Sequence, residues 1–96
     1  MLGIINQVFE IEQKTAAQNN TLLRNFERLY HEFEELGYKI VNPAGQPYDV
    51  RDASVEATII EHKETSMFVT KVIKPAVYKT EGGIYQLIQK SVVIVE

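Results

Sequence analysis

The apolar residues in the first third of the chain recur with a helical period. From position 22 onward they alternate steps of four and three residues, at Leu22, Phe26, Leu29, Phe33 and Leu36. This is the a/d spacing of a helix that packs against another helix, and charged residues fill most positions between. Gly37 follows directly, and glycine is favoured at the left-handed position that ends a helix. We therefore predict that this helix ends at Gly37.

The residues before Leu22 continue this register only in part. Ile5 and Val8 fit the apolar seam, but three polar residues fall within it, namely Glu12, Thr15 and Asn19. Two arrangements are open. Either one nearly continuous helix carries a polar stretch that fixes the register of its partner, or "QNNT" interrupts it and Asn20 or Thr21 caps a second helix. We favour the continuous helix.

The apolar stripe of this helix has two interpretations, because it could fold back onto the rest of the chain or pair with a second copy. A long stripe attached to a small domain leaves more apolar surface than that domain can cover. We therefore expect residues 1–37 to form a helical dimerisation segment. Its predicted contact residues are Leu22, Phe26, Leu29, Phe33 and Leu36.

The remainder of the chain has the pattern of β-structure. "NPAGQP" at 42–47 stops helical continuation. Segments 54–62 and 66–78 are rich in β-branched and aromatic residues, so we predict two antiparallel strands joined as a hairpin. Pro75 has no N–H and is expected at a strand end, an edge or a bulge. "KTEGG" at 79–83 predicts a turn into a final strand, whose second half is apolar on both faces and should be buried between two layers.

The predicted fold is therefore α+β, with the helical segment 1–37 followed by a small β-domain of short antiparallel strands at 38–96. A chain of 96 residues is long enough for one small domain. The net charge of -3 argues against a nucleic-acid partner. The absence of cysteine excludes disulfides and thiolate metal sites and favours a reduced, cytoplasmic setting. A basic leader and a long apolar run are both lacking, so we expect neither a signal peptide nor a membrane span.

Candidate chemical groups are few in this sequence. His31 on the polar helix face and His62 in a charged turn have no second histidine at helical spacing, so we expect no metal site. Asp49, Asp52 and Glu56 form an acidic cluster near the Pro/Gly loop. With His62 two of these carboxylates could serve a small enzyme, but acidic residues beside such a loop usually form turns, and no nucleophile accompanies them. We therefore expect that the protein is not an enzyme and binds no cofactor.

The order of these features resembles the C-terminal half of the GrpE nucleotide-exchange factors, over about Leu22 to Val95. The aromatic-Asp motif of that family is similar to Tyr48–Asp49, followed here by Val55 and Ala57. Its Gly-aromatic pair resembles Val77–Tyr78, and its closing strand resembles "IQKSVVIV" at 88–95. Three departures stand out, since Ala53 replaces the family's usual histidine, Val77 its glycine, and Gln89 the arginine of its last strand. The final turn is wider, and the family's longer helical region corresponds only to the segment before Leu22.

The resemblance implies a homodimer whose β-domain wedges one lobe of the ATPase domain of a DnaK-type heat-shock chaperone outward, so that ADP leaves. No catalytic residue is required for such a function. The expected contacts lie near the last hairpin, at Lys74, Tyr78, Gln86, Gln89 and Lys90. Tyr78 could equally be a core tyrosine. The rival hypothesis is a dimeric adaptor or structural module on a GrpE-like scaffold with a different protein partner.

Overall fold

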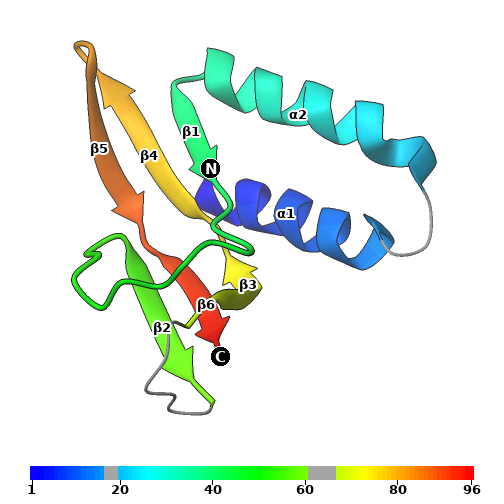
Figure 1. Cartoon of the computed structure of the whole chain (residues 1–96). Helices are drawn as coiled ribbons and strands as arrows, with labels where there is room; N and C mark the ends of the chain where they lie inside the picture. The colour runs from blue at the N-terminus through cyan, green and yellow to red at the C-terminus, as the bar shows by residue number, and fades with distance from the viewer. Residues whose placement is uncertain (17–19, 61–66) are drawn as a thin grey trace.

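The computed structural model describes residues 1–16, 20–60 and 67–96 and confirms the α+β class. Two helices, α1 (Leu2–Ala16) and α2 (Leu23–Glu35), precede six short strands. The strands are β1 (Tyr38–Val41), β2 (Val55–Ile59), β3 (Val69–Lys74), β4 (Ala76–Glu81), β5 (Ile84–Gln89) and β6 (Ser91–Val95). The helices lie beside one another on one side of the strands, and β5 lies on the side farthest from them (Figure 1). None of the described helices is long and apolar enough to cross a membrane.

The prediction of one nearly continuous N-terminal helix is wrong, and the structure shows the interrupted alternative. A single 3₁₀ turn at Asn20–Leu22 leads into α2, and the chain has reversed by then so that the two helices form a hairpin (Figure 1). The N-cap residue of α2 is Leu22, so the helix begins one or two positions after the predicted caps Asn20 and Thr21. Folding back allows Ile5 and Phe9 of α1 to be buried within the chain.

The end of α2 agrees with the prediction from Gly37. Gly37 has φ 91°, which only glycine adopts readily, and its N–H donates to the Glu34 carbonyl at 2.9 Å. The Lys79 ammonium donates to the Leu36 carbonyl at 3.0 Å and so satisfies one of the free carbonyls at the helix end. The glycine therefore redirects the chain into β1 at Tyr38.

The strands form two three-stranded sheets, with orders β1-β4-β5 and β2-β6-β3. The turn predicted at Gly82–Gly83 is confirmed and joins β4 to β5. Pro75 lies at a strand end, one of the three predicted places, between β3 and β4, where the chain passes from one sheet to the other. At Lys90 the predicted last strand crosses in the same way, so it is two strands in two sheets. A long bent hairpin thus runs through both sheets (Figure 1).

The predicted hairpin of segments 54–62 and 66–78 is wrong. β2 and β3 do not pair with each other, because β6 lies between them, parallel to β2 and antiparallel to β3. The sheet is therefore mixed rather than antiparallel throughout. β6 is the most apolar strand, and its central position lets it pair with a strand on each side. Val93 and Val95 are fully buried on one face of β6, and Val92 and Ile94 are half-buried on the other, so burial is complete on one face only.

The core has two clusters, and each contains residues from a helix and from strands. One cluster is formed by Phe9 of α1 with strand residues Val69, Val72, Val93 and Val95. The other joins Ile5 of α1, Phe33 of α2 and Val77 of β4. Because both clusters cross from helix to sheet, the helical hairpin holds the two sheets in place, and Val77 ties β4 to it.

Candidate functional site

The hairpin of β4 and β5 with its Gly82–Gly83 turn, here called the β4–β5 arm, carries most of the predicted partner contacts. Tyr78 and Gln86 lie on the arm, while Lys74 and Lys90 lie at its base, where the strands cross between sheets. Lys74, Gln86 and Lys90 are exposed, and Tyr78 is half-buried. The structure therefore brings these four predicted contacts to one part of the molecule. Gln89 lies there too, but its side chain is hydrogen-bonded within the chain.

Gln89 uses its side-chain amide within the chain. Its Oε1 accepts from the Asn6 amide at 2.9 Å, and its Nε2 donates both to Asn6 Oδ1 at 2.8 Å and to the Pro75 carbonyl at 2.9 Å. These bonds connect α1 to the point where the strands cross between the sheets. A partner could reach the amide only by displacing them, so Gln89 positions the arm rather than offering free polar atoms.

β5 is an edge strand with an unusually exposed set of apolar side chains. Ile84 is 67% exposed and Tyr85 54%, and Leu87 and Ile88 are also exposed. The helices pack on β1 and on Val77 at the base of β4 but leave β5 uncovered (Figure 1). The alternating pattern predicted the strand, but local sequence could not show that no neighbour covers it. Large apolar side chains gathered on one projecting element are typical of a protein-binding surface.

The turn fixes which backbone groups of β5 face the open side. Both turn glycines have positive φ, 58° at Gly82 and 81° at Gly83, as in a two-residue type I′ turn. In such a hairpin the flanking pair, Glu81 and Ile84, is hydrogen-bonded, and alternate residues point away. The N–H and C=O groups of Tyr85 and Leu87 therefore face the open edge, whereas those of Gln86 face β4.

The arm and its flank are basic. Lys39 of β1, Lys79 of β4 and Lys90 lie on or beside it, and Glu81 supplies the acidic group of these strands. Lys39 Nζ lies 5.5 Å from the ring centre of Tyr85. The helices, by contrast, are rich in glutamate. The protein thus has a negative helical side and a positive arm, a separation that the overall charge of -3 conceals.

Residues that carry the GrpE resemblance lie around one small cavity of about 360 Å³. It is lined by Tyr48 and Asp49 of the first motif, by Val55, by Tyr78 of the second motif and by Ser91 of the closing strand. Tyr48 also packs against the cluster that contains Val93. Positions far apart in sequence therefore meet at the base of the arm, although Tyr78 is neither fully buried nor fully exposed.

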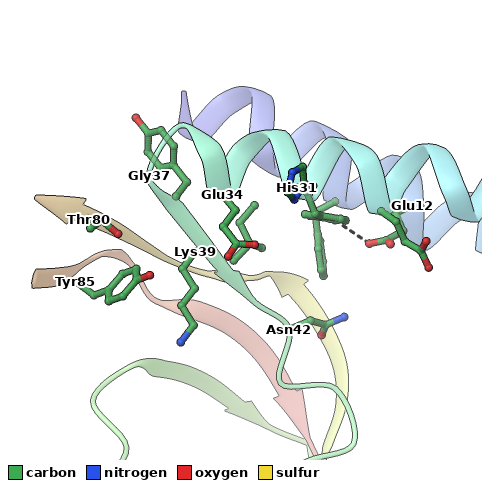
Figure 2. A pocket seen from close by; sticks show the side chains of 13 residues that line it. Glu12, His31, Glu34, Gly37, Lys39, Asn42, Thr80 and Tyr85 are labelled. Carbon is green, nitrogen blue, oxygen red and sulfur yellow. Dashed lines mark hydrogen bonds between the residues drawn. The ribbon is translucent and has the colours of Figure 1, made fainter. Parts of the chain in front are cut away.

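A larger cavity of about 740 Å³ lies between the helices and β1 (Figure 2). Glu12 lies at one end and Tyr85 at the other, with His31, Glu34 and Lys39 between. The Tyr30 hydroxyl donates to Glu12 Oε1 at 2.8 Å, and burial, this hydrogen bond and the negative carboxylate together raise the pKa of Tyr30. The sequence did not indicate this cavity, because Glu12 appeared as a polar interruption of a long seam.

The acidic cluster forms turns. The guanidinium and the backbone N–H of Arg51 both donate to the Asp49 carboxylate, which lowers the pKa of Asp49. Asp52 accepts from the N–H and hydroxyl of Ser54. His62 lies outside the described residues, so its predicted role cannot be placed. Within residues 1–16, 20–60 and 67–96, no group of three His, Cys, Asp or Glu is arranged to hold a metal ion.

The predicted dimer seam divides into two rows. Phe26 and Phe33 are buried within the chain, and Phe33 is 5% exposed against Ile5 and Val77. The leucines at every seventh position are exposed and form the other row, Leu22, Leu29 and Leu36. The phenylalanines thus serve the helical hairpin and the core, while the leucines remain available to a second copy.

Comparisons with protein-family models, curated proteins and solved structures find no match to this chain. The resemblance to GrpE factors therefore depends on the residues quoted above.

Proposed function

We propose that this chain is a GrpE-like nucleotide-exchange factor that promotes ADP release from a DnaK-type heat-shock chaperone through its β-domain. The β4–β5 arm supports this proposal most directly. It extends beyond the cover of the helices, and β5 exposes its apolar side chains along an open edge. A surface of this kind suits contact with another protein. The protein acts by binding and needs no catalytic residue.

Exchange by such a factor is differential binding. A factor lowers nucleotide affinity only to the extent that it prefers the open form of the chaperone, and couplings of this kind are commonly about 1–3 kcal/mol. A rigid arm favours this action, because a flexible one would adapt to both forms. β4 is held on one side by β1 and beneath by the fully buried Val77, so the arm can press against a lobe without yielding.

Dimerisation through α2 completes the proposal. The exposed leucine row of Leu22, Leu29 and Leu36 would pair with the same row of a second copy. Residues seven apart fall near one side of a helix, and here Leu29 lies in α2, Leu22 in the 3₁₀ turn before it and Leu36 at its C-cap. Each dimer would then carry two arms, and the assembly would act in the cytoplasm, where DnaK-type chaperones work.

The test is release of a fluorescent ADP analogue from a purified DnaK-type chaperone. The protein should accelerate release, and Gln86→Ala and Lys90→Ala should weaken the acceleration because both side chains are exposed on or beside the arm. Lys14→Ala is the matched control, since Lys14 is an exposed lysine on α1 that pairs with Glu10. No acceleration at saturating protein would refute the proposal.

A dimeric adaptor with a different partner is the second candidate. The internal bonding of Gln89 favours it, because the position that resembles the family's arginine offers no free side-chain group here. An exchange factor should bind the nucleotide-free chaperone more tightly than the ADP-bound form. A protein that remains an intact dimer and binds neither form would instead be an adaptor.

A further inference from the structure

We propose that β5 binds an extended, acidic segment of the partner protein as an additional strand on its open edge. This inference rests on the proposed function, because the segment belongs to the chaperone. It adds the mode of recognition, which is backbone pairing between the segment and the edge of the β1-β4-β5 sheet. The segment would make the sheet four-stranded.

The open edge has the properties of a template for pairing. The backbone groups of Tyr85 and Leu87 face away from β4, as the type I′ turn requires. Natural edge strands are usually protected by a charge or a proline within the strand, but Ile84–Gln89 contains neither. The pairing irregularity of β5 lies between Leu87 and Gln89, so the ladder to β4 is regular from Ile84 to Leu87. The outer part is regular and unprotected.

The side chains beside the edge define which segment fits. Lys39, Tyr78 and Leu87 are opposite one another across the three strands and share one face with Tyr85. An incoming strand would place alternate side chains against Tyr85 and Leu87 on this face. We therefore expect apolar residues at alternate positions of the segment, as in other cases of strand addition.

Charge identifies the segment as acidic. Lys39 lies beside Tyr85, and Lys90 follows the end of β5. Carboxylates flanking the apolar positions would meet these lysines. A second copy of β5 is a poorer occupant, because it has no carboxylate between Ile84 and Gln89 and brings its own lysines. Charge complementarity therefore favours a foreign acidic strand.

A proline substitution at a residue whose N–H faces the open edge distinguishes the contribution of backbone pairing from that of side-chain contact. Leu87→Pro removes a donor from the open edge and leaves the ladder to β4 intact, because the Leu87 N–H does not take part in it. Leu87→Ala removes a similar part of the side chain but keeps the N–H. We expect Leu87→Pro to bind the nucleotide-free chaperone ATPase domain at least about tenfold more weakly than Leu87→Ala. Circular dichroism and thermal melting establish that both variants fold.

Amide exchange of the wild-type protein, followed by NMR, provides a measurement that needs no substitution. The N–H groups of Tyr85 and Leu87 should exchange quickly in the free protein and at least about tenfold more slowly in the complex. The Gln86 N–H should be protected in both states. Binding should also weaken as ionic strength rises, because the lysines are exposed.

The outcomes distinguish the two proposals. If the wild-type protein neither binds nor accelerates ADP release, the proposed function fails and the inference fails with it. If the wild-type protein accelerates release but Leu87→Pro and Leu87→Ala bind the chaperone ATPase domain with equal affinity, the proposed function stands and strand addition is wrong. Unchanged exchange at Tyr85 and Leu87 in the complex is equally decisive if the proline variant does not fold. Self-association that Leu87→Pro abolishes would show that a second copy occupies the edge, which also overturns the proposal.

Discussion

The amide pair of Asn6 and Gln89 should couple the helices to the sheets by an amount that can be measured. Three hydrogen bonds meet at Gln89, two with Asn6 and one with the Pro75 carbonyl. They are neutral and partly buried, so we take a net value in the lower part of the usual range, about 0.7 kcal/mol each. Gln89→Ala should then lower the free energy of unfolding by about 2 kcal/mol, and the loss of the two bonds in Asn6→Ala by about 1.5 kcal/mol.

A double-mutant cycle isolates the pair. Alanine is a better helix former than asparagine, so Asn6→Ala recovers about 0.5 kcal/mol through α1, but this gain cancels in the cycle. The coupling energy should be about 1.5 kcal/mol, since the double variant loses the shared bonds once. Urea unfolding at a single protein concentration measures it, because a dimer's apparent stability depends on concentration. The midpoint of Gln89→Ala should fall by roughly 8–16 °C in a thermal scan.

A coupling energy below about 0.3 kcal/mol would refute this account, because independent sites add to within about that value. Lys90→Ala is the internal control, as Lys90 is adjacent in sequence but exposed. It should leave the free energy of unfolding within about 0.5 kcal/mol of the wild type. The same contrast between Gln89 and Lys90 applies to assays of nucleotide exchange. Loss of activity in a Gln89 variant reports arm position as well as contact, whereas loss in a Lys90 variant reports contact.

Three further predictions concern the helices. Gly37→Ala should lower the free energy of unfolding by about 1–2 kcal/mol in urea, because φ is 91° and the new Cβ would lie 3.2 Å from the Lys79 ammonium. In Tyr30, the folded-state pKa is raised above the ordinary 10.0, so the unfolded state loses its proton first and stability falls as pH rises past that value. Tyr30→Phe should melt lower near neutral pH, by the loss of about 1 kcal/mol from the bond to Glu12, and should show a smaller decline above about pH 10. Leu29→Glu should sediment as a folded monomer since Leu29 is exposed, whereas Phe26→Asp should unfold because that ring is buried; an unchanged dimer in Leu29→Glu would exclude the leucine row.

Features set by local chemistry were predictable from the sequence. The helix end at Gly37, the turn at Gly82–Gly83 and the strand end at Pro75 each follow from one residue whose backbone preferences are strong. The α+β class followed from the change of period near Gly37. These predictions need only residues adjacent in the chain, so they did not depend on tertiary packing.

Features set by distant contacts were not predictable in the same way. The parallel pairing of β6 with β2 depends on which strand gains most from two neighbours, and adjacent segments 54–62 and 66–78 gave no sign that a later strand would separate them. The division of the apolar seam into two rows has a related cause. The spacing placed Phe26 and Leu29 on one stripe, but in the folded helical hairpin Phe26 is buried and Leu29 is exposed.

The candidate site was half predictable. Charge and position near the last hairpin identified Gln86 and Lys90 on or beside the arm, but exposure of the β5 edge depends on where the helices stop. Gln89 shows the limit most clearly. Its type is suited to surface contact, and only the presence of Asn6 on a helix 83 residues earlier in the sequence gives its amide partners.

The bonding of Gln89 also bears on how a GrpE-like action would work in this chain. A cation at this position could meet a partner directly, but a neutral amide can match both the donor and the acceptor of Asn6 and still reach the Pro75 carbonyl. The bonds join α1 to the crossing point from which the arm extends. If α2 pairs two copies through its leucine row, the orientation of each arm is then set by the helical hairpin that it is bonded to. In such a dimer, contacts at the exposed edge of β5 would determine the binding affinity, whereas the hydrogen bonds of Gln89 would fix the orientation of the arm.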